Sequence, residues 1–108
     1  MDQARAVTAF VAARMDAAVA LLERLVAIES PSQDPATHAP AFALLETELE
    51  RAGFAVRYLG GKNASRHLLA RPVARRKGRP LQLLLGHIDT VWPVGTLVDM
   101  PLQRDADQ

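Results

Sequence analysis

His87 and Asp89 are the two residues whose types and spacing best suit chemistry, and they follow the apolar run 83–85 and Gly86. If residues 81–86 form a strand, both side chains point to the same side, because residues two apart share one face of an extended chain. A neutral imidazole is the commonest metal ligand, and a carboxylate beside it can orient the ring. A His-x-Asp pair alone is weak evidence, since a hydrogen-bonded histidine followed by a turn-capping aspartate has the same sequence.

The composition limits the kinds of protein that can present this pair. The chain has 108 residues, enough for one domain (1–108), and 49% of them are hydrophobic, enough for a core. It has no cysteine, which excludes disulfides, thiolate zinc sites and cysteine nucleophiles. A net charge of +1 gives no indication of nucleic-acid or membrane binding. The longest apolar run near the N-terminus is only 17–22, so we expect a soluble, non-exported protein of the cytoplasm.

Periodicity and turn residues predict the elements that must position the pair. The sequence predicts helices over 3–29 and 41–52 and strands over 54–59, 66–71 and 81–86. The first helix should stop at Ser30, because a residue before proline leaves the α region. The second should begin between Thr37 and Pro40 and end at Gly53.

The expected sheet combines a hairpin with a third strand. Strands 54–59 and 66–71 should pair antiparallel around a turn at 60–63. Segment 81–86 carries leucines on both faces and is therefore expected in the interior of a covered sheet. The sequence predicts an α/β fold with two helices followed by three strands.

The stretch "LLLGHIDTVWPVGTL" (83–97) resembles the first metal-site signature of a family of di-zinc amidohydrolases and peptidases. This family includes glutamate carboxypeptidases, acetylornithine deacetylase, succinyl-diaminopimelate desuccinylase and aminoacylase. "LLERLVAIESPSQDP" (21–35) is similar to its first helix and the loop after it, and "LLETELERAGFAV" (44–56) to its second helix and first strand. The resemblance covers nearly the whole chain in the right order.

The resemblance implies the N-terminal part of a zinc-exopeptidase-like catalytic domain. In such enzymes the histidine matching His87 ligates one of two zinc ions, and the aspartate matching Asp89 is a catalytic-site residue. Cobalt or manganese could replace zinc. The implied activity is hydrolysis of amide or peptide bonds in small peptides or N-acyl amino acids, by a carboxypeptidase or deacylase. Complete relatives form homodimers through a lid domain.

The chain also departs from the family pattern. The bridging aspartate, the glutamate pair with its general base, a further carboxylate ligand and a distal histidine have no counterpart in 1–108. Asp105 and Asp107 match a solvated turn and are not assigned as ligands. We therefore expect an N-terminal fragment, without the lid domain, that is inactive alone. A non-catalytic remnant or a small partner-binding module is the alternative.

Other polar and aromatic residues receive structural interpretations. His38 should be a helix-capping or exposed residue, and His67 a structural or exposed strand residue. Ser30 and Ser32 lack a local histidine–acid partner and are not expected to be nucleophiles. Trp92 is expected to pack behind the site, although a contact with substrate is an alternative.

A basic cluster and one aspartate are expected in loops. The cluster lacks interleaved aromatic residues, so a solvated loop is favoured over a nucleic-acid site; its members are Arg71, Arg75, Arg76, Lys77 and Arg79. Asp34 precedes a proline and is expected in a turn.

Overall fold

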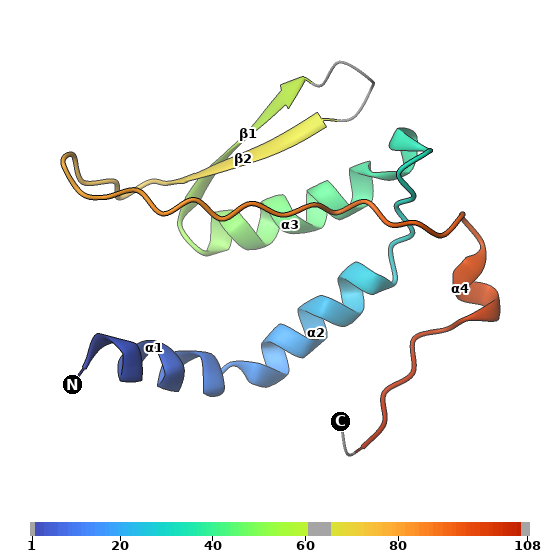
Figure 1. Ribbon diagram of the computed structural model, residues 1–108, viewed down its shortest axis with the longest axis horizontal. Coiled ribbons are helices and arrows are strands. Elements are labelled where there is room, and N and C mark those ends of the chain that lie inside the picture. Colours follow the sequence, from blue (N-terminus) through green and yellow to red (C-terminus); the bar gives the residue numbers. More distant parts are fainter. Residues whose placement is uncertain (1, 61–65, 107–108) are drawn as a thin grey trace.

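The computed structural model describes residues 2–60 and 66–106 and shows a mixed fold of helices and a small antiparallel sheet (Figure 1). The coarse α/β prediction is therefore confirmed. In chain order the elements are α1 (Gln3–Ala12), α2 (Met15–Val26), the 3₁₀ helix η1 (Pro35–Thr37), α3 (Ala39–Arg51), β1 (Phe54–Gly60), β2 (Arg66–Pro72) and α4 (Thr96–Asp99). None of the helices in the described part of the chain is long and apolar enough to cross a membrane.

The prediction of one continuous helix over 3–29 is wrong, because α1 and α2 are separated at Ala13 and Arg14. The Arg14 guanidinium donates to the Phe10 carbonyl (3.3 Å) and lies over the Phe10 ring, 3.5 Å from its centroid. The Arg14 backbone N–H donates instead to Val11 O (3.0 Å), a 3₁₀-type bond that ends the helix. No residue of α1 is buried, so no packing opposes this break.

The helix and hairpin that follow agree with their predictions. Helix α3 begins at Ala39, inside the expected interval, and Gly53 after it has φ 88°, a left-handed conformation that favours glycine. Strands β1 and β2 pair antiparallel with Val56 opposite Ala70. Helix α3 packs against this sheet, where Phe42 contacts Tyr58 edge to face, and two other residues of α3, Ala41 and Leu44, are buried. Of the expected turn, Gly60 belongs to β1, and 61–63 lie outside the described residues.

The predicted third strand is wrong. Residues 81–86 form no ladder with any described strand, and the sheet contains only β1 and β2 in the part of the chain that the structure describes. Figure 1 shows this segment as a drawn-out stretch that crosses α3 in the view (orange). Leu84 and Leu85 are 97% and 91% exposed. A strand requires a neighbour for its backbone groups, and composition alone does not provide one.

Candidate metal-ligating site

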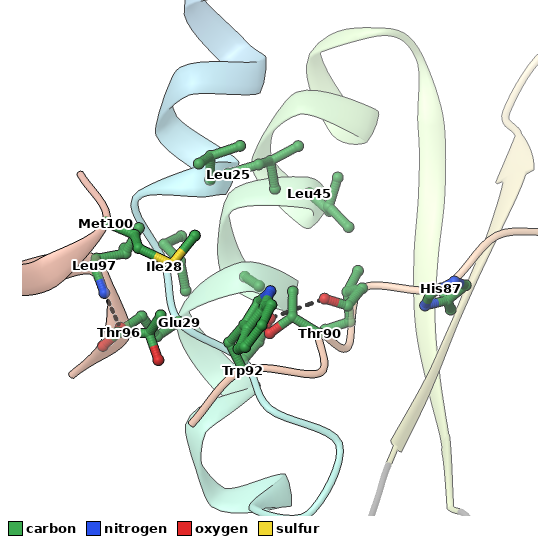
Figure 2. Close-up of a pocket in the computed structure, with 14 residues that line it drawn as sticks. Leu25, Ile28, Glu29, Leu45, His87, Thr90, Trp92, Thr96, Leu97 and Met100 are labelled. Carbon is green, nitrogen blue, oxygen red and sulfur yellow. Dashed lines mark hydrogen bonds between the residues drawn. The ribbon is translucent and has the colours of Figure 1, made fainter. Parts of the chain in front are cut away.

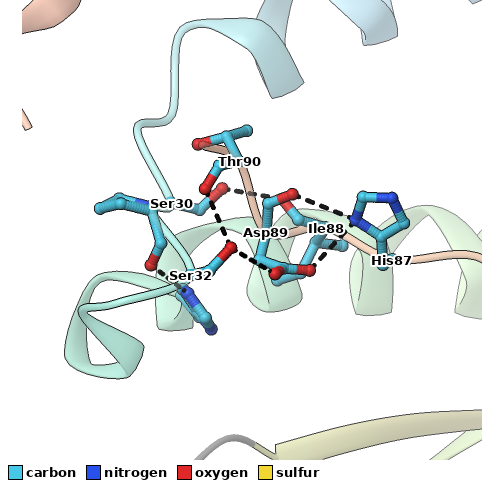
Figure 3. A network of polar contacts seen from close by, with 8 residues as sticks. Ser30, Ser32, His87, Ile88, Asp89 and Thr90 are labelled. Carbon is cyan, nitrogen blue, oxygen red and sulfur yellow. Dashed lines mark hydrogen bonds and ion pairs between the residues drawn. The ribbon is translucent and has the colours of Figure 1, made fainter. Parts of the chain in front are cut away.

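The site segment is held by the linker between α2 and α3, about 58 residues earlier in the chain. Pro31 and Thr90 form an isolated parallel bridge. Ser32 N donates to Thr90 O and Thr90 N donates to Ser30 O, both at 2.9 Å. These two bonds join the linker to the backbone immediately after His87 and Asp89 (Figure 3).

Two serine hydroxyls complete this attachment. Ser30 Oγ donates to Ile88 O at 2.8 Å, and Ser30 is buried. Ser32 Oγ lies 2.6 Å from Asp89 Oδ2 and 3.1 Å from Thr90 O. A hydroxyl has one proton, so the short contact with the carboxylate is the main hydrogen bond. No local sequence pattern indicates that these serines position the site.

The His87 and Asp89 side chains meet, as expected from their spacing. His87 Nδ1 lies 3.1 Å from both Asp89 Oδ1 and the Asp89 carbonyl oxygen. Both of these atoms accept hydrogen bonds, so Nδ1 is the donor and Nε2 carries the lone pair of the neutral ring. The His87 side chain is 81% exposed. This arrangement, with a carboxylate on one ring nitrogen and the other nitrogen available, is typical of a metal-ligating histidine.

The Asp89 carboxylate is held in its ionised form. Its pKa is lowered, first by the hydrogen bond from Ser32, with further contributions from its own backbone and from His87, while desolvation acts in the opposite direction. Its two oxygens are engaged by different partners: Oδ1 by His87 and Oδ2 by Ser32. Asp89 therefore orients the imidazole.

A complete zinc site does not form from the residues that the structure describes. Residues 2–60 and 66–106 contain no cluster of three or more histidine, aspartate or glutamate side chains. A structural or catalytic zinc needs at least three protein ligands. The fit is thus limited to one imidazole, His87, with Asp89 behind it. Asp105 is exposed, and Asp107 lies outside the described residues.

Glu29 is a further residue that the sequence did not single out. Its carboxylate accepts from the backbone N–H of Gly95 (2.9 and 3.0 Å) and of Leu97 (2.9 Å). These bonds, that from Leu97 first, lower the pKa of Glu29. Gly95 has φ 100°, which lets the chain turn toward the carboxylate. Glu29 lies in the linker just after α2 and attaches the turn that follows the site to this linker. The contact spans 66 residues of sequence, so no local pattern predicts it.

An apolar cavity of about 440 Å³ lies between α2, α3 and segment 87–100 (Figure 2). Leu25 of α2, Leu45 of α3 and Ile28 of the linker line one wall, and His87 lies at its edge. Trp92 also lines it but is 59% exposed, so its ring packs only partly.

The remaining candidates have clear positions. His38 was predicted to be a cap or exposed, and this is wrong. It is 4% exposed and makes no side-chain cap bond, and its Nε2 lies 2.8 Å from the carbonyl oxygen of Pro31, seven residues earlier in the same linker. His67 is exposed on β2, as expected. Asp34 lies in a turn, where its backbone N–H donates to Pro31 O. The residues of the basic cluster are all exposed. Four of them lie in the loop after β2, as expected, whereas Arg71 belongs to β2.

No protein-family model, curated protein or solved structure was found to match this chain.

Proposed function

We propose that this chain supplies the first metal-binding segment of a metal-dependent hydrolase of amide or peptide bonds. The observation that carries the proposal is the contact between His87 Nδ1 and Asp89 Oδ1, which turns Nε2 of an exposed ring outward. The motif at 83–97 supports the same conclusion, since it resembles the first metal-site signature of the di-zinc hydrolases. The substrate class is small peptides or N-acyl amino acids, handled by a carboxypeptidase or deacylase.

The proposal gives each residue a distinct task. His87 binds zinc through Nε2, and cobalt or manganese could replace the zinc. Asp89 orients the ring by accepting a hydrogen bond from the Nδ1–H group. Bound zinc supplies Lewis acidity toward a carbonyl oxygen. The described residues do not close the metal shell, so no catalytic step is assigned to them. The zinc-exopeptidase-like domain, homodimer and cytoplasmic location belong to the same proposal.

Metal titration of the chain tests the ligand assignment. We expect weak Zn²⁺ binding, seen as changes in the His87 ring signals by nuclear magnetic resonance (NMR), that His87→Ala abolishes. Asp89→Asn should weaken binding by about 10-fold or more, because partners of ligating histidines typically contribute that much. His67→Ala is the matched control, since His67 is also exposed. Equal binding at His67 and His87 would contradict the proposal.

A hydrolysis assay tests how much of the activity these residues carry. With excess zinc and N-acyl amino acid or glutamate-containing peptide substrates, we expect no turnover above the His87→Ala variant. One imidazole with one carboxylate lacks the remaining ligands and the general base, which typically contributes 10²–10⁴-fold. Turnover that depends on His87 would show that the further ligands are not essential.

A small partner-binding module is the second candidate, because the leucines of 81–85 are exposed. An exposed apolar segment is a typical surface for pairing with another chain. Binding of a partner to this segment should be lost in Leu84→Lys and retained in His87→Ala. The metal-site proposal predicts the opposite pattern for zinc.

A further inference from the structure

His38 occupies a position that its local sequence did not predict. Its ring is buried, and Nε2 lies 2.8 Å from the carbonyl oxygen of Pro31. A carbonyl only accepts, so Nε2 carries the proton and Nδ1 is left with its lone pair. Nδ1 is buried and has no hydrogen-bond partner in the part of the chain that the structure describes. A buried polar atom without a partner lowers the stability of the fold, so a buried histidine at this position needs a compensating role for its Nε2 hydrogen bond.

The Pro31 carbonyl belongs to the peptide group that carries Ser32. It accepts two hydrogen bonds, from His38 Nε2 and from the Asp34 backbone N–H (3.1 Å). The N–H on the other side of the same peptide plane is that of Ser32, which donates to Thr90 O at 2.9 Å. A peptide group is rigid and planar, so fixing its carbonyl fixes the direction of its N–H. His38, together with the Asp34 N–H, therefore holds the plane from which Ser32 reaches the site.

Ser32 transmits this orientation to the candidate ligand. Its hydroxyl donates to Asp89 Oδ2 at 2.6 Å, and Asp89 Oδ1 accepts from His87 Nδ1. A rotation of the Pro31–Ser32 peptide would move the Ser32 Oγ and the bridge to Thr90 together. The Asp89 carboxylate would then lose the partner that fixes its rotamer.

We propose that His38 is a positioning residue for the His87–Asp89 pair, acting through the Pro31–Ser32 peptide plane. It sets the orientation of Asp89 and thereby the tautomer and direction of the His87 ring. The consequence for metal affinity rests on the proposed function, whereas the consequence for the His87 ring does not.

The test compares two replacements of His38 in the full chain. His38→Leu fills a similar volume without a donor, and His38→Gln retains an N–H donor toward Pro31 O. The ring-nitrogen shifts of His87 report its tautomer, and a Zn²⁺ titration reports affinity. His67→Leu controls for loss of a histidine, and Leu44→Ala controls for loss of stability away from the linker.

We expect His38→Leu to shift the His87 signals toward a mixture of tautomers and to weaken Zn²⁺ binding by about threefold. This is less than the 10–100-fold typical of a direct partner, because His38 acts through Ser32 and Asp89. His38→Gln should restore both readouts to within about twofold of the original chain. The two control variants should leave the His87 signals unchanged.

Three results would overturn the inference: an unchanged His87 signal in His38→Leu, an equal change in Leu44→Ala, or no recovery in His38→Gln. If His38→Leu fails to fold, His38→Asn takes its place, since its shorter amide does not reach the Pro31 carbonyl. Equal His87 signals in the Asn and Gln variants would then contradict the role. If the original chain binds no Zn²⁺, the proposed function fails, while the tautomer signals still decide the role of His38.

Discussion

The unit formed by α3 and the hairpin differs from segment 79–100 in how each is held. In the first, neighbouring stretches of sequence pair with one another: β1 and β2 form a ladder, and α3 packs on the sheet, where Phe42 contacts Tyr58 edge to face. Leu44 of the same helix is buried. In the second, Leu84 and Leu85 are almost fully exposed. Segment 79–100 is attached through polar contacts with the linker, chiefly those of Ser32 and Glu29.

This contrast separates two physical tasks. Burial of apolar side chains stabilises a fold without specifying orientation, at about 1.5–3 kcal/mol for a large side chain. Hydrogen bonds contribute less net stability but fix direction, which a ligand needs. The site segment thus receives orientation from distant polar partners and little stability from packing. The two regions should respond differently to the same kind of change.

The largest expected difference comes from removing one leucine in each region. Leu44→Ala should lower the free energy of unfolding by about 2–4 kcal/mol, because Leu44 is buried and its truncation leaves a cavity. Leu84→Ala should change it by less than about 0.5 kcal/mol, since the side chain is exposed. Urea unfolding followed by circular dichroism measures both. Similar losses for the two variants would show that segment 79–100 is buried in solution.

The next largest effect is expected in segment 79–100, where Glu29 holds two backbone amides. Glu29→Gln should release the Gly95 and Leu97 amides, because the neutral amide replaces the carboxylate that accepts from both. Hydrogen exchange at these two positions should become about 10-fold faster, while amides of β1 and β2 stay unchanged. Asp16→Asn, which replaces a carboxylate on α2, is the control. If exchange at Gly95 is no faster in Glu29→Gln than in the control variant, this attachment is contradicted.

Acidification should separate the two regions without mutation. The pKa values of Glu29 and Asp89 in the folded chain lie below their ordinary values of 4.5 and 3.8. Their contribution to stability is therefore present above those ordinary values and lost as the pH falls through the lowered ones. Trp92, the only tryptophan, should report the change by fluorescence while the circular dichroism of the hairpin persists. Simultaneous loss of both signals would mean that the regions are one cooperative unit.

The smallest expected effect concerns the ionisation of Tyr58 in the unit formed by α3 and the hairpin. Desolvation and the hydrogen bond to Glu46 (2.5 Å) raise the pKa of Tyr58 to about 12. Because this exceeds the ordinary value of 10, its contribution is present below pH 10 and lost as the pH rises through about 12. Absorbance titration of this single tyrosine measures the value directly. Glu46→Gln should lower it, and an unchanged titration would exclude the contact.

The sequence by itself determined the elements whose cause is local. Helix α3 ends at Arg51, just before Gly53, whose left-handed conformation stops the helix. The two strands expected at 54–59 and 66–71 pair antiparallel as β1 and β2. The contact between His87 and Asp89 was also local, since residues two apart lie on one side of an extended chain.

The tertiary structure alone decided which distant groups meet. Periodicity over 3–29 did not reveal the break at Arg14, where the guanidinium group donates a hydrogen bond to the carbonyl oxygen of Phe10. The leucines of 81–86 predicted a strand, but a strand needs a neighbouring strand for its backbone hydrogen bonds, and the composition of a segment does not show whether one is present. Glu29 and Ser32 reach the site across 57 to 68 residues, and their local patterns are those of ordinary helix-end and loop residues. Such contacts depend on how the whole backbone folds, because only that brings a donor and its acceptor within hydrogen-bond distance.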